Sequence, residues 1–182
     1  MSLLLAAALL PIGLSGCSMT TEQGRDGEAH SSRVKLYPSV KSMAEDSSTV
    51  VVGTVTEQRV AADIDQTTDF TISTVEVSTV QKAKDPIVRG DKLIVRQVGS
   101  QKQPEPGPLM AVGTTYLLYL TPSGLEGELS AQFYITGANA GLYQAVAAER
   151  QTSYAANDVF KQVEKQDGED LPAELTLSES TK

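Results

Sequence analysis

Hydrophobic and polar positions alternate along most of this chain in short segments that polar turns separate. The six apolar segments lie at 49–60, 70–80, 92–98, 114–122, 131–136 and 141–146. They are rich in Val, Ile and Thr, whose branched side chains favour pleated strands, and Gly, Pro or Asp mark the turns. No helical period alternates with the strands. The pattern therefore predicts a mainly β fold, a small antiparallel barrel of about six strands with Greek-key or meander connections.

Two of the predicted strands carry an irregularity. Gly53 interrupts the first apolar segment, which predicts a bend or a bulge. In the second segment the apolar residue Ile72 lies at an even-numbered position, whereas the apolar residue Val75 lies at an odd-numbered position. Side chains alternate between the two faces of a strand, so this change predicts either a bulge near 73–74 or burial of both faces. The segment 114–122 is so apolar that both of its faces are expected to be covered.

One or two short helices are expected to flank the barrel domain, which spans 36–148. Ser39 is a good N-cap for a first helix, in which Val40, Met43 and Ala44 would share one face. This helix would come directly before the first strand and pack its apolar face against the barrel.

The C-terminal segment 149–182 is predicted as a short helix followed by an acidic, largely disordered tail. A helix over 157–168 would place three residues on one apolar face: Val159, Phe160 and Val163. The residues beyond it are mostly polar, although 174–178 can add an edge strand.

A different pattern opens the chain, where residues 3–14 form an almost entirely apolar run. The run is too short to cross a bilayer core, which needs about 20 residues, and it has the size of the apolar region of a signal peptide. The sequence LSGC at 14–17 resembles the lipobox of bacterial lipoproteins. This resemblance implies that residues 1–16 are a signal peptide and that cleavage exposes Cys17, which then carries a diacylglycerol.

Lipidation of Cys17 would fix where the protein works. The polar segment 17–35 begins with this cysteine and is expected to be a flexible tether, so the domain would be exported and held at the outer face of the cell membrane. The covalent lipid is the only non-protein group that we expect. Cys17 is also the only cysteine, so no disulfide braces the domain. The alternative interpretation makes Cys17 a small buried hydrophobe in an N-terminal helix.

Composition excludes several classes of function. The net charge is −8, and an acidic surface disfavours nucleic acid, because binding there depends on Lys and Arg that displace counterions from phosphates. The only histidine, His30, lies in the predicted tether. With Cys17 acylated, the chain lacks the residues for a His-dependent triad or a common Cys/His zinc site. We therefore expect no nucleic-acid partner and assign no catalytic residue.

The turn between the first two strands contains Asp63, Asp65 and Asp69. Carboxylates at alternate positions suit calcium, which binds about six to eight oxygens. The EF-hand pattern fails, because Thr68 and Thr74 stand where it requires Gly and Glu. The turn is therefore either a weak, irregular calcium site or an acidic hairpin tip.

A second acidic pair lies on the first two strands. Glu57 and Glu76 would lie opposite each other if these strands pair about residue 66. Two facing carboxylates can hydrolyse a glycoside, which makes a carboxylate-dependent cell-wall hydrolase an alternative function. Two exposed acids on a hairpin are the simpler interpretation.

Aromatic, proline and glycine residues of the later strands and loops are candidate contacts for a partner. Tyr119, Tyr134 and Tyr143 can form an exposed interaction surface if they point away from the barrel, although core positions with scattered surface residues are the simpler interpretation. The segment 101–108 contains three prolines and is either a long barrel loop or a polyproline ligand. The segment 137–141, GANAG, lacks the spacing of a phosphate-binding loop and predicts a glycine turn.

Several strand segments resemble those of Gram-positive lipoproteins and secreted proteins of unknown function. The similar blocks are VVVGTV, FTISTVEVSTVQKA, GDKLIVRQVG, VGTTYLLYL and ITGANAGLYQ, within about residues 36–146. The resemblance implies a barrel similar to the oligonucleotide/oligosaccharide-binding type, which tissue inhibitors of metalloproteinases also use. In those inhibitors a free N-terminal cysteine amine chelates zinc, and an acylated Cys17 would lack that amine.

These observations together predict a lipid-anchored, monomeric binding module of the cell envelope. Its partner would be an unidentified protein or glycan. Two alternatives stay open, namely the cell-wall hydrolase and a spacer without any ligand. An enzyme requires Glu57 or Glu76 in a cleft with a partner, whereas a binding module requires an accessible surface without convergent acids.

Overall fold

The computed structural model describes residues 35–105, 107–146, 153–165 and 168–182. The predicted signal peptide, Cys17 and His30 lie outside the described residues, as does the predicted tether up to residue 34. The described elements are α1 Val40–Asp46, β1 Thr49–Ala61, β2 Phe70–Ala83, β3 Lys92–Val98, β4 Thr115–Pro122, η1 Gly127–Ala131, β5 Phe133–Ile135, β6 Leu142–Ala145, β7 Val159–Gln162, β8 Glu174–Thr176 and η2 Leu177–Glu179, where η marks a 3-10 helix.

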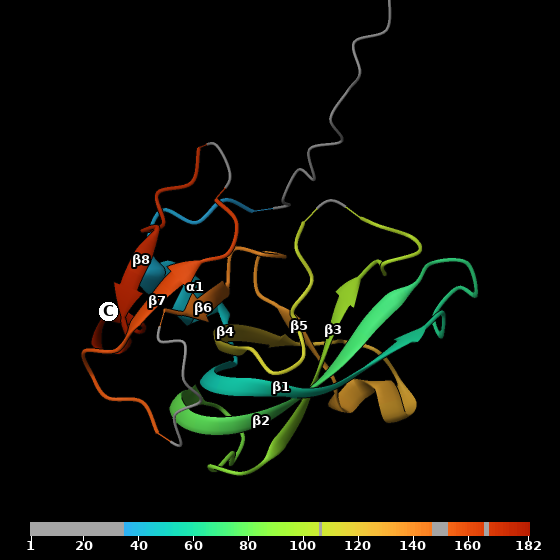
Figure 1. Ribbon diagram of the computed structural model, residues 1–182, viewed down its shortest axis with the longest axis horizontal. Helices are drawn as coiled ribbons and strands as arrows, with labels where there is room; N and C mark the ends of the chain where they lie inside the picture. The colour runs from blue at the N-terminus through green and yellow to red at the C-terminus, as the bar shows by residue number, and fades with distance from the viewer. Residues whose placement is uncertain (1–34, 106, 147–152, 166–167) are drawn as a thin grey trace, which may run out of the picture.

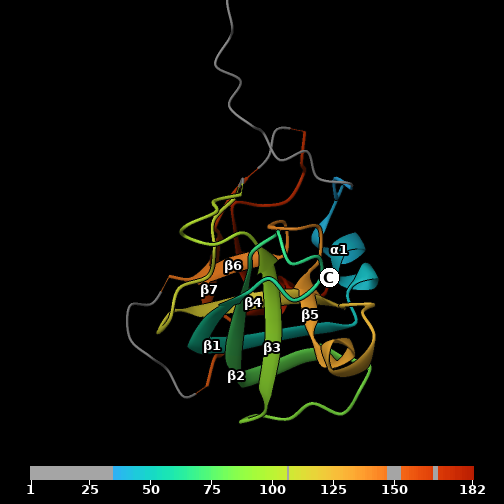
Figure 2. The same ribbon diagram turned by 90° about the vertical axis from the view of Figure 1, so that its right-hand side faces the viewer.

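Five of these strands close into a barrel. β1 pairs with β2 along its length and with β4 through its first half. β3 lies between β2 and β5, and β5 pairs with β4, so the order β1-β2-β3-β5-β4 returns to β1. β6, β7 and β8 continue the sheet from β4 (Figures 1 and 2). The predicted mainly β class and the barrel are confirmed, and the sixth predicted strand, now β6, lies outside the closed ring.

The sequence predicted an antiparallel barrel, and this part of the prediction is wrong for one pair of strands. β3 and β5 pair in parallel, through Val95 with Phe133 and Arg96 with Tyr134. The reason is geometric, because a ring with an odd number of strands cannot close through antiparallel pairs alone. The strand order also places β5 between β3 and β4, which excludes a simple meander.

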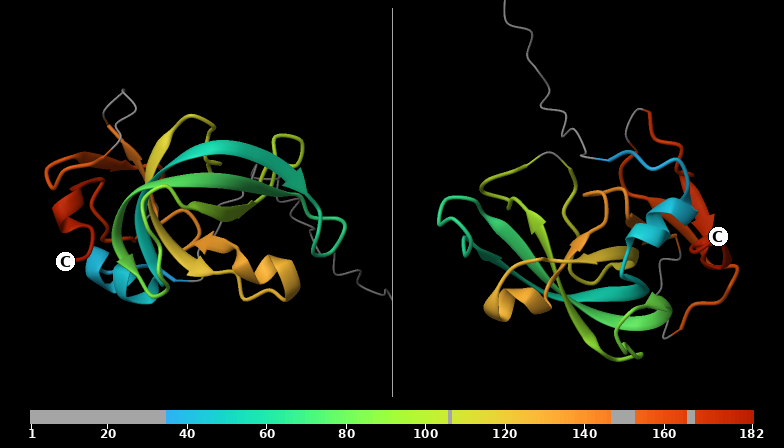
Figure 3. Two further views of the ribbon diagram at one scale, coloured as in Figure 1. Left: turned by 90° about the horizontal axis from the view of Figure 1, so that it is seen from below. Right: turned by 180° about the vertical axis from the view of Figure 1, so that it is seen from behind.

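The apolar residues divide between two cores. The first fills the barrel interior and includes Val51, Val55, Val75, Val77, Leu93, Val95, Met110, Leu118, Leu120, Ile135 and Leu142. The second lies outside the barrel, where α1 and the strands β6 to β8 cover one side of it (Figures 1 and 3). It includes Tyr37, Met43, Val50, Val52, Leu117, Tyr119, Tyr143, Phe160, Leu171, Leu175 and Leu177.

β4 shows how the two cores share a strand. Leu118 and Leu120 point into the barrel, whereas Leu117 and Tyr119 point into the second core. All four side chains are fully buried. The prediction that both faces of 114–122 are covered is therefore confirmed, and the continuous apolar run reflects burial on two sides rather than on one.

β1 bends where the sequence placed a glycine. Its register against β2 shifts at three places, one of them between Val52 and Gly53. A Cβ atom at Gly53 would lie 2.5 Å from Val75 Cγ1 and 3.0 Å from the Glu76 carbonyl oxygen, so only glycine fits this close approach. The predicted bend at Gly53 is confirmed, and such irregularities let long strands curl into a small barrel.

The structure of β2 decides between the two interpretations of its sequence pattern. Its register against β3 is continuous from Phe70 to Glu76, which excludes a bulge on that side. Ile72 and Val75 are both buried although they point to opposite faces of the strand. Of the two predicted alternatives, burial of both faces is the one that the structure has.

The helix α1 forms as its sequence predicts. The Ser39 hydroxyl accepts a hydrogen bond from the Ser42 backbone N–H at 3.1 Å, which caps the helix. Val40, Met43 and Ala44 form the buried face that packs into the second core.

The helix predicted over 157–168 is wrong. Residues Val159–Gln162 form the strand β7, which pairs with β6 on one side and β8 on the other. Burial alternates along it, since Phe160 is fully buried whereas Val159 is 37% exposed. The sequence concealed this alternation because the second inward residue is polar Gln162, which is 7% exposed. Pairing with neighbouring strands overrides the weak helical pattern.

The tail predicted to be largely disordered is also structured over its described residues. Leu171, Leu175 and Leu177 are buried in the second core. The edge strand predicted within 174–178 is present as β8. The 3-10 helix η2 follows it, and a reciprocal capping box joins Thr176 and Glu179. These three leucines therefore hold the C-terminal segment against the second core, although the overall composition of the segment is polar.

Candidate functional site

The long loop between β3 and β4, residues 99–114, separates two hollows in the surface. The β5-side hollow has a volume of about 410 Å³ and is lined by Arg96, Gln97, Val98, Glu105, Gly107, Pro108, Leu109, Tyr134, Ile135, Ala138 and Asn139. The β1-side hollow has a volume of about 530 Å³ and is lined by Gln58, Arg59, Val60, Asp69, Thr71, Ser100, Gln101, Lys102, Leu109 and Met110. Leu109 borders both hollows, so the loop forms the wall between them.

Two glutamines of the barrel hold this loop in place. The Gln97 side chain accepts a hydrogen bond from the Met110 backbone N–H at 2.9 Å and donates one to the Pro108 carbonyl at 3.1 Å. Gln58 donates to the Met110 carbonyl at 2.7 Å. These bonds come from β3 and β1, on either side of the loop, so its backbone is fixed from both hollows. The segment 101–108 is thus a barrel loop in this structure.

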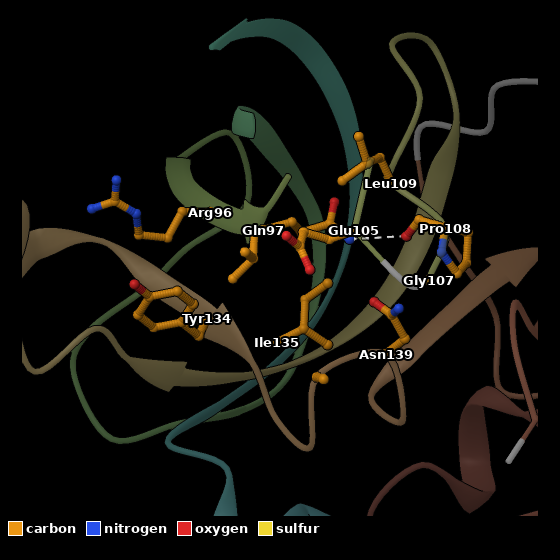
Figure 4. Close-up of a pocket in the computed structure, with 11 residues that line it drawn as sticks. Arg96, Gln97, Glu105, Gly107, Pro108, Leu109, Tyr134, Ile135 and Asn139 are labelled. Atoms are coloured by element: carbon orange, nitrogen blue, oxygen red, sulfur yellow. Dashed lines mark hydrogen bonds between the residues drawn. The ribbon is translucent and has the colours of Figure 1, made fainter. Parts of the chain in front are cut away.

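The β5-side hollow carries several polar groups. Figure 4 shows Gln97, Glu105 and Asn139 around it, with Ile135 below them. Asn139 donates a hydrogen bond to the Glu164 carboxylate at 3.3 Å. Gly107 lets the loop come close to this asparagine, because a Cβ atom there would lie 2.0 Å from Asn139 Nδ2. The hollow can therefore offer both donors and acceptors to a polar ligand.

The β1-side hollow combines charge with an apolar floor. Arg59 and Lys102 contribute two positive charges and Asp69 one negative charge, while Leu109 and Met110 contribute apolar surface. Such a mixture of a few polar groups and apolar lining is typical of small binding sites.

The acidic turn does not gather its three carboxylates. Asp63 forms an ion pair with Arg96, whereas Asp69 accepts a hydrogen bond from the Ser100 hydroxyl at 2.6 Å. Asp65 accepts bonds from the backbone N–H groups of Thr67 and Thr68, at 2.8 and 2.7 Å, and from the Thr68 hydroxyl. These donors hold the pKa of the Asp65 carboxyl well below its usual range. Each carboxylate thus has its own structural role.

Within the described ranges no group of three or more His, Cys, Asp or Glu side chains is arranged to hold a metal ion. The second acidic pair is not assembled either. Glu57 lies opposite Thr74 and Glu76 lies opposite Thr54, so the two carboxylates are not cross-strand partners, and both are exposed. The segment 137–141 forms the tight turn between β5 and β6, with Gly137 at φ 66° and Ala138 at φ 57°.

Of the two interpretations of the tyrosines, core burial is confirmed for two of the three, and the exposed interaction surface is wrong for those two. Tyr119 and Tyr143 are fully buried in the second core. Their hydroxyl groups donate to the carbonyls of Ser180 at 2.8 Å and Pro172 at 3.2 Å. They do point out of the barrel, but α1 and the C-terminal strands cover that side. Tyr134 alone is partly exposed, and it lines the β5-side hollow.

Sequence reasoning missed Arg96, whose side chain is completely buried. One guanidinium nitrogen, Nη2, forms the ion pair with Asp63. The guanidinium carbon lies 4.6 Å from the centre of the Phe70 ring, a cation–π contact. The other two nitrogens, Nε and Nη1, have no hydrogen-bond partner among the described residues. The available signal was a single arginine within the apolar strand KLIVRQV.

The chain matches no model of a known protein family, and no curated protein shows a significant match to it. Among the residues that the structure describes, no helix has the length and apolar character needed to cross a membrane.

Proposed function

We propose that this protein is a lipid-anchored, extracytoplasmic binding module of the cell envelope and that it works as a monomer. The observation that carries the binding role is the pair of hollows on either side of a loop that the barrel fixes by Gln58 and Gln97. A site that is already shaped loses little entropy when a ligand binds. The polar lining suits hydrogen bonds to a glycan or a peptide.

The strand arrangement supports the finer part of the fold proposal. We propose that the barrel is of the oligonucleotide/oligosaccharide-binding type, a five-stranded, partly open Greek-key barrel. The order β1-β2-β3-β5-β4 with closure onto β1 agrees with this type, as does the single parallel pair. The acidic charge of the chain favours a ligand other than nucleic acid.

The geometry favours binding over the alternative functions. A cell-wall hydrolase would rest on Glu57 and Glu76, which line neither hollow and do not face each other. A spacer without a ligand would have no use for a loop that is fixed between two hollows. We therefore propose a binding role without catalysis, for a protein or glycan partner.

The described chain begins at the end of the molecule that carries the β3–β4 loop. The described chain begins at Lys35 on the side where the β3–β4 loop projects (Figures 1 and 2). If the predicted tether behaves as a flexible coil, residues 18–35 span roughly 21–25 Å. The proposed lipid on Cys17 would thus keep the hollows close to the membrane surface, where envelope polymers and membrane proteins are within reach.

A site-specific photo-crosslinking experiment tests the proposed binding role. A photoreactive residue replaces exposed Gln101 in the β1-side hollow of the intact, anchored protein, and cells are irradiated before extraction. We expect a light-dependent adduct with a protein or glycan of the envelope. The matched control places the same residue at Val88, which is 62% exposed on the β2–β3 turn. No adduct at Gln101, or equal adducts at both positions, would contradict the proposal.

A further inference from the structure

Arg96 lies on the outer side of β3, beyond the barrel interior. Its neighbour Val95 points into the barrel core, so Arg96 points outward. Ile72 on β2 and Tyr134 on β5 are its cross-strand partners. Figure 4 shows the guanidinium pointing away from Gln97 at the edge of the β5-side hollow. The guanidinium of Arg96 therefore lies beside the β5-side hollow rather than inside it.

The guanidinium of Arg96 is only partly satisfied. It carries five N–H donors, yet Asp63 binds one nitrogen, and Nε and Nη1 are buried without a partner among the described residues. Burying a charged group without full hydrogen bonding costs free energy, and an aliphatic side chain here would avoid that cost. Unsatisfied buried donors of this kind call for an explanation, and a missing ligand is one of the recognised explanations.

Asp63 contacts Arg96 from the first half of the turn 62–69, and its side chain is 27% exposed. The second half of the turn is held by the β3–β4 loop, because the Gly99 N–H donates to the Asp69 carbonyl at 2.7 Å and Gln103 donates to the Thr67 carbonyl at 3.2 Å. Only one oxygen of Asp63, Oδ1, contacts one nitrogen of the arginine. Asp65 stiffens the same turn through bonds to Thr67 and Thr68, but these bonds are internal and do not tie the turn to β3. A free carboxylate or phosphate can bind two guanidinium N–H groups in parallel, which is a stronger arrangement than this single contact.

We propose that Arg96 is the anchor of an oxyanion-binding site and that Asp63 occupies this site in the free protein. A carboxylate or phosphate group of the ligand replaces Asp63, and residues 62–66 move aside to admit it while Thr67 and Asp69 stay bound to the β3–β4 loop. The neutral part of the ligand then lies along Tyr134 in the β5-side hollow, which Arg96 also lines. This role rests on the proposed binding function and assigns its ligand a chemical class, an oxyanion.

The test measures anion binding by the purified full chain, labelled with nitrogen-15. Arginine Nε–H signals are followed by nuclear magnetic resonance while inorganic phosphate or acetate is added at constant ionic strength. We expect the Arg96 signal, assigned by its loss in Arg96→Met, to shift saturably with at least one anion. Saturation by acetate alone indicates a carboxylate ligand, and saturation by phosphate alone indicates a phosphate ligand. No shift with either anion overturns the proposal.

The variant Asp63→Asn supplies the second part of the test, because its amide loses the charge of Asp63 but keeps an oxygen that can accept a hydrogen bond from the guanidinium. Removing the internal competitor should tighten anion binding about fivefold, which is the scale of a partly exposed ion pair. The matched control Asp85→Asn removes the same charge from the distant β2–β3 turn and should leave the affinity unchanged. Equal tightening in both variants, or none in Asp63→Asn, contradicts the proposal. Neither result depends on an envelope partner, so failure here is distinct from failure of the crosslinking experiment.

Discussion

Burial changes the chemistry of individual side chains in this protein, most clearly among the tyrosines. Tyr37 is 4% exposed at the edge of the second core, and its hydroxyl donates to the Asp46 carboxylate at 3.1 Å. Burial, together with this hydrogen bond and the charge of Asp46, raises the pKa of Tyr37 from 10.0 to about 12. Burial also raises the pKa of Tyr119 well above its usual range.

The raised pKa of Tyr37 predicts a loss of stability at alkaline pH. The folded protein holds the Tyr37 proton more tightly than the unfolded chain, so its contribution is complete below pH 10.0 and declines as the pH rises toward about 12. We expect the difference in unfolding free energy between wild type and Tyr37→Phe to be constant near neutral pH and to shrink across this window. Urea unfolding at a series of pH values measures it. A difference that stays constant throughout would contradict the assignment.

At the scale of elements, the periodic pattern predicted the barrel strands well and the C-terminal strands poorly. Strand 92–98 has the predicted bounds, and the other barrel strands differ by a few residues. Their alternation is strong because each presents apolar residues to at least one core. β7 lacks that signal, since its inward residues are Phe160 and polar Gln162. A short strand buried by its neighbours leaves too few apolar positions for its period to be recognised.

The candidate site was less predictable than the fold, for a related reason. A pattern along the chain reports whether a residue alternates, but not what covers its outward face. The sequence pattern therefore left open whether Tyr119 and Tyr143 lie at the surface or in a core, and in the structure α1 and β6 to β8 cover them. The ion pair of Arg96 with Asp63 joins a strand to a turn that lies 33 residues earlier. The β1–β2 hairpin and its pairing with β3 bring these two residues together.

The strand character of β7 predicts unequal effects of two neighbouring substitutions. Phe160→Ala should reduce the free energy of unfolding by about 3–5 kcal/mol, because the ring is fully buried in the second core. Val159→Ala should change it by less than about 1 kcal/mol, because that side chain is 37% exposed. Chemical denaturation of both variants measures the contrast. Comparable losses would indicate that both side chains face the core, as on the apolar face of a helix.

At the scale of the whole molecule, a lipid on Cys17, as proposed, would decide which end of the domain lies nearer the membrane. The β3–β4 loop projects at the end where the described chain begins (Figure 1). A flexible link from that end to a lipid would leave the opposite end, with the β2–β3 turn, farther from the bilayer. Binding near the surface then gains from the high local concentration of membrane-attached partners.

The proposed lipidation of Cys17 predicts a clear labelling result. When the full chain is expressed in a bacterial host that is fed an alkyne fatty acid, the protein should acquire the label and fractionate with membranes, because two acyl chains suffice for stable attachment. Cys17→Ala should lose both properties. Ser18→Ala, one residue further along, should keep them. A labelled Cys17→Ala protein would show that the lipid, if present, is attached elsewhere.

β1 and β4 contribute alternate residues to both cores, so the barrel and its C-terminal cover share these two strands and form one structural unit. No cut in the sequence separates the barrel from its C-terminal cover without stripping one side of these two strands. Limited proteolysis should accordingly trim loops but release no folded fragment. The same restriction applies to sequence change. The loops around the hollows can diversify, whereas β1 and β4 must keep side chains that pack into both cores.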